Sequence, residues 1–167
     1  MTDRRAVGPE SRVEDVGHPL SEQEFHEIYA KVPRLTVEVV IQSPLGILLT
    51  KRTGGPCSRL WHIPGGTVRF GEPLVAAVRR VASMELGLEV EAGPLLGYIE
   101  YPSHYLSGLD SPVGIAFHCH VDVDVDVDAE LMADATSGRG WFTAPPEPMH
   151  TEQVDFLTNR GLLMTDR

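Results

Sequence analysis

Apolar residues recur at two different periods along the chain, and these periods predict its strands and helices. Residues 34–42 (RLTVEVVIQ) and 46–52 (GILLTKR) are β-rich runs separated by SPLG, which predicts a β-hairpin. Two longer strands are expected over 88–101 and 111–127, and a short one over 138–143. The predicted strands therefore lie before and after a central segment that does not show a strand pattern.

Three segments show the spacing of apolar residues that is typical of an amphipathic helix. They are residues 22–31, 72–86 and 151–163. A capping-box spacing precedes the first, Pro73 is expected in the first helical position of the second, and Thr151 is a candidate N-cap for the third. Strands before and after one central helix, with another helix at the end, predict a mixed α/β (α+β) layered fold.

The central helix carries an acidic residue where an apolar one is expected. Leu74, Val78 and Val81 form its apolar stripe, and Glu85 lies only about 20° around the helix from Leu74. A carboxylate on a buried face is costly unless another group pairs with it. The position of Glu85 therefore predicts a partner for it.

Length and composition limit the number of domains and the kind of partner. With 167 residues, 42% of them hydrophobic, the chain is expected to form a loose polar arm over 1–19 and a single domain over 20–167. A formal net charge of −10 disfavours nucleic acid and anionic membranes as partners and favours a small ligand. The two cysteines are widely spaced, the N-terminus lacks the apolar core of a signal peptide, and no apolar run is long enough to cross a bilayer. These features predict a cytoplasmic protein.

The run VDVDVDVD at 121–128 invites a metal-site interpretation, because alternation puts four aspartates on one strand face. A strand with valine inward and aspartate in water explains the same residues and discourages edge-to-edge aggregation. The run lacks the mixed geometry of a calcium loop, so the structural interpretation is favoured.

The segment WHIPGGTVRFGEPLVAAVRRVASMELGLEV, residues 61–90, has more specific spacing. It resembles the Nudix box, whose pattern is Gly, five residues, Glu, seven residues, then Arg-Glu-apolar-any-Glu-Glu-any-Gly-apolar. The matching positions are Gly66, Glu72, Arg80, Ala82, Glu85, Gly87 and Leu88. The resemblance covers roughly residues 34–160 and implies a Nudix-type α/β/α sandwich with a mixed β-sheet and the Nudix loop-helix.

The resemblance also implies a metal site. A helix carboxylate and a free carbonyl in a glycine loop are hard oxygen ligands for Mg²⁺, which neutralises a diphosphate. On the family pattern Glu85 and the Gly66 carbonyl are the ligands, with Mg²⁺ as the cofactor and Mn²⁺ as a second possibility. Glu72 pairs with Arg80 in the family, so this pair, with Gly87, is expected to form the structural loop-helix.

Two positions depart from the family pattern. Val81 and Met84 stand where the full pattern has two further glutamates. With one carboxylate left, metal affinity should fall and water activation needs another base.

One branch of the family, the GDP-mannose mannosyl hydrolases, tolerates this loss and cleaves at the sugar carbon. The helix RRVASMELGL and the LLTKR strand are similar to that branch. On that resemblance Glu38 assists the departing sugar, Arg52 binds the diphosphate, and the helix before the first strand implies a homodimer.

The metal-binding Gln and general-base His of that branch have no counterpart here. Counting back from Trp141 gives Ala135 and Thr136. The candidates for the base are His104, Glu130, Asp134 and His150, none of them placed by a motif.

Plain structural roles also stay open: Glu85 as an ion-pair partner of an arginine, Glu38 as an edge residue facing water, and His150 as a surface residue.

Three functions remain. The leading one is a Mg²⁺-dependent hydrolase of a nucleoside diphosphate linked to another moiety, a nucleotide sugar above all, giving nucleoside diphosphate and sugar. The second is a conventional Nudix pyrophosphohydrolase that gives a nucleoside monophosphate. The third is a Nudix fold that binds a nucleotide or a protein and hydrolyses nothing.

Overall fold

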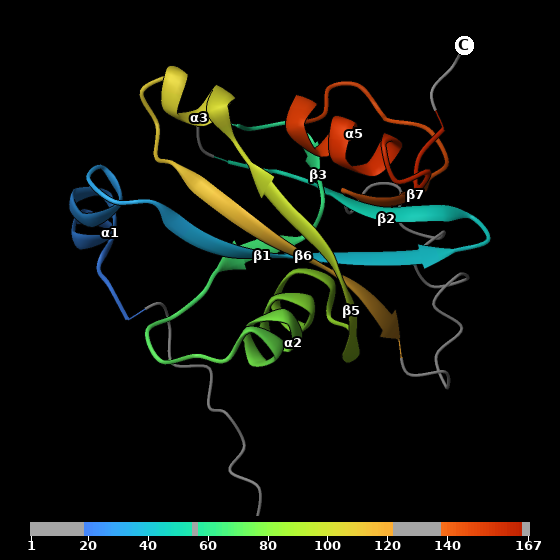
Figure 1. The fold of residues 1–167 in the computed structure, drawn as a ribbon, viewed down its shortest axis with the longest axis horizontal. Helices are drawn as coiled ribbons and strands as arrows, with labels where there is room; N and C mark the ends of the chain where they lie inside the picture. The colour runs from blue at the N-terminus through green and yellow to red at the C-terminus, as the bar shows by residue number, and fades with distance from the viewer. Residues whose placement is uncertain (1–18, 55–56, 122–137, 165–167) are drawn as a thin grey trace, which may run out of the picture.

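A computed structural model describes residues 19–54, 57–121 and 138–164 (Figure 1). Its helices are α1 (Glu22–Tyr29), α2 (Leu74–Leu86), α3 (Pro102–Leu106) and α5 (Thr151–Thr158). Its strands are β1 (Arg34–Ser43), β2 (Gly46–Lys51), β3 (Trp61–His62), β4 (Gly65–Thr67), β5 (Val90–Glu100), β6 (Pro112–Val121) and β7 (Arg139–Phe142). The aspartate run beyond Val121 and two candidate bases, Glu130 and Asp134, lie outside the described residues.

The strands form a mixed sheet in the order β3-β2-β1-β6-β5, with β4 paired to β1 and β7 paired to β2. Strands β1 and β6 run parallel, and the other pairs are antiparallel. On the side away from β6, β1 pairs with β4 over residues 36–38 and with β2 over residues 42–43. The sheet therefore forks beside the middle of β1.

Alternation along β1 divides the core into two layers. Val37, Val39 and Ile41 pack in the cluster that contains the buried side of α2. Val40 packs in the other cluster, with Phe156 of α5. Figure 1 shows α2 on one side of the sheet and α3 and α5 on the other. The predicted mixed α+β architecture with a mixed sheet is confirmed, and Glu38 belongs to the α5 side by the same alternation.

Helix α2 begins two residues later than predicted. Pro73 is its N-cap and Leu74 its first residue, because the chain before it is held in the loop. The apolar stripe continues through Leu86, which is 3% exposed, whereas Glu85 is exposed as a residue. Glu85 as a whole residue is therefore less buried than its place in the stripe predicted, although its carboxyl group faces Gly65 and Thr50 of the sheet.

The last helix is shorter than predicted. It ends at Thr158, and Gly161 then takes a left-handed backbone, with the N–H of Leu162 bonded to the carbonyl of Leu157. His150 holds the N-cap position that was predicted for Thr151, and no side chain caps the helix.

The sequence pattern missed three short elements, β3, β4 and α3. Each has five residues or fewer, so none carries a periodic pattern. Among the described residues there is no helix with the length and apolar content that a membrane span requires.

Candidate active site

The connection from β4 into α2 is fixed by a two-pronged ion pair. Arg80 Nε and Nη2 donate to the two carboxylate oxygens of Glu72 at 2.6 and 2.8 Å. The same Nη2 donates to the Thr67 carbonyl at 2.9 Å, and the Arg69 N–H donates to Glu72 at 2.9 Å. The bonds from Arg80 lower the pKa of Glu72. The two residues that the family pattern pairs are thus brought together, and they close the loop-helix.

Glu85 lies in the last turn of α2, beside the fork in the sheet. The residue is exposed as a whole, but its carboxyl group is turned toward Gly65 and Thr50. Loss of solvent around that group raises its pKa to about 7, against the opposing effects of Arg52 and of hydrogen bonds from Gly65 and Thr50. Glu85 is therefore a partly desolvated acid whose charge is only partly balanced.

Glu38 is a buried acid in β1 and is 5% exposed. Its Oε1 accepts hydrogen bonds from the hydroxyls of Thr36 at 3.1 Å and Tyr101 at 2.9 Å. Burial raises the pKa of Glu38 to about 8, the charge of Glu85 adds to the rise, and the two hydroxyls and Arg34 oppose it. Glu38 therefore holds a proton at neutral pH, and its interpretation as an edge residue facing water is wrong.

Two glycines make room for the Glu38 carboxyl group. A Cβ added at Gly65 or at Gly114 would collide with it. Gly65 is the partner of Glu38 in the ladder between β1 and β4, and Gly114 lies in β6 on the opposite side of β1. Backbone on both sides thus limits where this acid can point.

Arg52 connects two neighbouring hollows. The first is lined by Glu38 and Gly66 as well as Arg52, and the second by Glu85 and Arg52. The backbone of Arg52 is fixed by a hydrogen bond from its N–H to the Leu60 carbonyl at 3.0 Å. A guanidinium between two acids is well placed to bind a phosphate group.

Val81 and Met84, at the two substituted positions of the Nudix box, bring no charge to the surroundings of Glu85. Val81 is 3% exposed, and a Cβ added at Gly66 would lie 2.8 Å from its Cγ2. Met84 is 58% exposed. Of the three helix carboxylates in the family pattern, only Glu85 is therefore present. Arg80 is paired with Glu72, so the arginine that acts on the charge of Glu85 is Arg52.

His104 and His150, two of the candidate bases, line the first hollow. Each is 9% exposed, so the interpretation of His150 as a surface residue is wrong. Burial lowers the pKa of His150 to about 4, and the neighbouring basic groups of His104, His62 and Arg52 add to the effect. The His150 ring is therefore neutral at pH 7 and has a free lone pair.

The sequence analysis did not single out several residues that line or support the first hollow. They are Arg34, Cys57, Tyr101, Asp110 and Gln153. The Gln153 amide donates to the Tyr101 hydroxyl at 2.9 Å and accepts from the Ile63 N–H at 2.8 Å, so α5 and the segment just after β3 are tied to Glu38 through Tyr101. These residues come from separate elements with no shared spacing; their only signal is a polar side chain beside a predicted strand or helix end.

Comparison with known proteins agrees with this geometry. The family model for the NUDIX domain matches residues 32–154. Over 115 residues the chain is 37% identical to the low-salt glycan biosynthesis protein Agl8 of Haloferax volcanii, which covers 66% of this chain and 69% of that protein.

Solved structures share the fold. A MutT NUDIX hydrolase from Burkholderia pseudomallei is similar with a TM-score of 0.61 and 26% identity, over 76% of this chain and 97% of that one. NrtR of Shewanella oneidensis, solved with a 27mer DNA, has a TM-score of 0.55 and 19% identity over 76% of this chain and 59% of its own, which shows a common fold alone. Because the family model spans most of the chain and the hydrolase from Burkholderia shares its architecture, the chain belongs to the NUDIX family and is a Nudix hydrolase.

Proposed function

We propose that this Nudix hydrolase acts on a nucleotide sugar and cleaves it at the sugar carbon, giving a nucleoside diphosphate and a free sugar. The observation that carries the proposal is the pair of acids beside Arg52. Glu85 is the single accessible carboxylate of the loop-helix, and Glu38 is a buried acid that lines the first hollow. The glycan biosynthesis protein at 37% identity supports a sugar-related substrate.

The residues present suit one hard divalent cation, Mg²⁺ or alternatively Mn²⁺. Glu85 offers a carboxylate, and Gly66 of the neighbouring strand offers a backbone carbonyl as the second ligand of the family pattern. Burial raises the pKa of the Glu85 carboxyl group to about 7, and a cation bound beside it would favour the ionised form. When bound, such a cation neutralises the negative charge that a departing diphosphate develops.

The remaining roles follow from charge and protonation. Arg52 faces both hollows and binds the diphosphate. Glu38 is protonated at neutral pH, so it can donate a hydrogen bond to a sugar oxygen that an ionised carboxylate would repel.

Cleavage at carbon is favoured over cleavage between phosphorus atoms because of the substituted box positions. Attack at phosphorus relies on several carboxylates to hold cations and activate water, and Val81 and Met84 supply none. Departure of a whole diphosphate needs stabilisation of the leaving group alone.

The test is a product assay in ¹⁸O-labelled water with nucleotide sugars, dinucleotides and nucleoside triphosphates, each with Mg²⁺ and with a chelator. Cleavage at carbon places the label in the sugar and releases a nucleoside diphosphate. Label in a phosphate group together with a nucleoside monophosphate would identify a conventional pyrophosphohydrolase. No turnover at high enzyme concentration with Mg²⁺ or Mn²⁺ would identify a binding module.

The ligand assignment is tested separately. Glu85→Gln is expected to lower Mg²⁺-dependent turnover by about 100-fold or more, because the cation loses its charged ligand. Glu89→Gln, which changes an exposed carboxylate just after α2, is the matched control. Full activity in Glu85→Gln would remove Glu85 from the site.

A further inference from the structure

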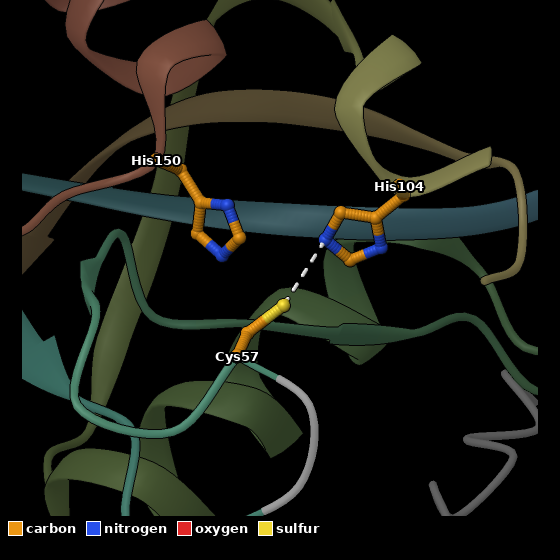
Figure 2. A group of neighbouring side chains, drawn as sticks. All are labelled: Cys57, His104 and His150. Atoms are coloured by element: carbon orange, nitrogen blue, oxygen red, sulfur yellow. Dashed lines mark hydrogen bonds between the residues drawn. The ribbon is translucent and has the colours of Figure 1, made fainter. Parts of the chain in front are cut away.

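A second group of potential ligands lies at one wall of the first hollow. Cys57, His104 and His150 each offer one ligand atom, and the three atoms all lie within 4.8 Å of one another. Figure 2 shows the two rings approaching from α3 and from the start of α5, with the thiol between and below them. The proposed hydrolysis does not use the cysteine.

Backbone hydrogen bonds fix the segments that carry Cys57 and His150. The Cys57 carbonyl accepts from the Leu60 N–H at 3.3 Å, within a loop whose two sides are joined by the bond between Arg52 and Leu60. That loop is tied to the segment before His150, because the Trp61 N–H donates to the Pro148 carbonyl at 2.8 Å. The three side chains therefore converge on a prepared framework.

The ring of His104 is oriented by a carboxylate. His104 Nδ1 lies 3.2 Å from Asp110 Oδ1, and Asp110 forms an ion pair with Arg34. Because a carboxylate oxygen accepts hydrogen bonds, the contact with Asp110 assigns the proton to Nδ1, and Nε2 then presents its lone pair to Cys57. A histidine held by a carboxylate in this way is the usual arrangement around a bound metal.

The distances suit a tetrahedral ion. Zinc bonds of about 2.3 Å to sulfur and about 2.0 Å to nitrogen place the two ligand atoms about 3.5 Å apart. The distance from Cys57 Sγ to His104 Nε2 is 3.7 Å. The ligand atom of His150 lies within 4.8 Å of those of Cys57 and His104. To reach bonding distance from a shared ion, it would need to move closer by about an ångström or slightly more, which a rotation of the His150 ring could supply.

We infer that Cys57, His104 and His150 bind a zinc-type divalent cation, with the fourth position open toward the first hollow. Thiolate and imidazole select zinc and similar late transition metals, whereas Mg²⁺ requires oxygen ligands such as Glu85. The chain would then carry two chemically distinct cation sites. Because both histidines line the same hollow as Arg52, the fourth ligand is water or a bound substrate.

The test uses the reduced full-length chain, freed of metal with a chelator and titrated with Co²⁺ and Zn²⁺. One equivalent of Co²⁺ is expected to give the near-ultraviolet band of a cobalt–thiolate bond and the intense visible bands of a tetrahedral ion. Zn²⁺ is expected to displace Co²⁺ and to protect Cys57 from alkylation, measured on the Cys57 peptide by mass spectrometry. The protection measurement needs no variant, so a folding defect cannot obscure it.

Variants assign the ligands. Cys57→Ser should abolish the thiolate band, and His104→Gln and His150→Gln should each weaken Zn²⁺ binding by about 10-fold or more. Cys119→Ala and His120→Gln are the matched controls, because Cys119 is buried in the α2-side core and His120 is exposed on β6.

Two outcomes would overturn the inference. One is a Co²⁺ spectrum without a thiolate band, or a band that survives in Cys57→Ser. The other is rapid alkylation of Cys57 that Zn²⁺ does not slow, which would identify a reactive cysteine–histidine pair. Glu85→Gln separates this site from the proposed hydrolysis: it should remove Mg²⁺-dependent turnover and leave the Co²⁺ spectrum unchanged.

Discussion

Replacement of Glu38 by glutamine should stabilise the folded protein at alkaline pH. The native pKa is about 8, against an ordinary value of 4.5, because the carboxyl group is buried. The folded state therefore holds a proton that the unfolded chain releases above pH 4.5. The contribution of Glu38 to the free energy of unfolding is fully present below pH 4.5 and is lost as the pH rises through the native pKa.

The magnitude follows from linkage. Each pH unit between the two pKa values lowers the free energy of unfolding by about 1.4 kcal/mol, so the change from pH 5 to pH 8 amounts to roughly 4 kcal/mol. Glutamine has the same shape, and its carbonyl oxygen can accept the hydrogen bonds from Thr36 and Tyr101 without a charge. The variant should therefore match the wild type near pH 5 and exceed it by a few kcal/mol at pH 8.

Urea unfolding of both proteins, followed by tryptophan fluorescence in chelator at pH 5, 6.5 and 8, measures the difference. Other groups titrate almost equally in the two proteins, so subtraction isolates Glu38. Glu89→Gln is the exposed control and should show no such pH-dependent gain. A Glu38→Gln variant that is less stable by the same amount at every pH would refute the reasoning, since it would mean that Glu38 is ionised and stabilised by its surroundings.

Three further substitutions test the framework of the site. Arg80→Lys should lower the free energy of unfolding in urea by about 1–2 kcal/mol, because lysine cannot make the two-pronged bond to Glu72, whereas Arg79→Lys on the exposed side of α2 should change little. Gly65→Ala should lower both stability and turnover, since its Cβ collides with the carboxyl group on β1; unchanged kinetics would show that this acid has room to move. Val81→Glu should lower the melting temperature of the metal-free protein, because it buries a carboxylate, and Mg²⁺ should restore part of the loss without changing the cleavage products; no recovery with Mg²⁺ would argue against a cation beside Gly66.

The sequence predicted the long elements and the loop-helix because each depends on local spacing. Runs rich in β-forming residues located β1 and β2, and the fixed distances of the Nudix box brought Glu72 and Arg80 into register. It missed β4, because two of its three residues are glycines and pairing with β1 alone makes it a strand. It overestimated the burial of Glu85, because a helical wheel assumes burial up to the last turn, whereas here Leu86 is the buried residue.

The cluster of Cys57, His104 and His150 lay beyond any sequence rule. Cys57 and His104 are 47 residues apart, and the three belong to a loop, a five-residue helix and a helix cap. Nothing in their spacing resembles a known metal motif. They meet because the loop after β2 is tied to the segment before α5, which is a property of the tertiary structure.

The buried acid explains why the fold keeps features that weaken it. Glu38 opposes folding at neutral pH, and two glycines that contribute no side-chain packing are needed to leave space for it. A sequence selected for stability alone would carry an amide at 38 and a larger residue at 65 or 114. Since a buried acid that weakens the fold persists where function requires it, stability and turnover should move in opposite directions in Glu38→Gln. A variant that gains stability and keeps full turnover would show that Glu38 is not part of the chemistry, and would leave Arg52 and Glu85 as the residues that define the site.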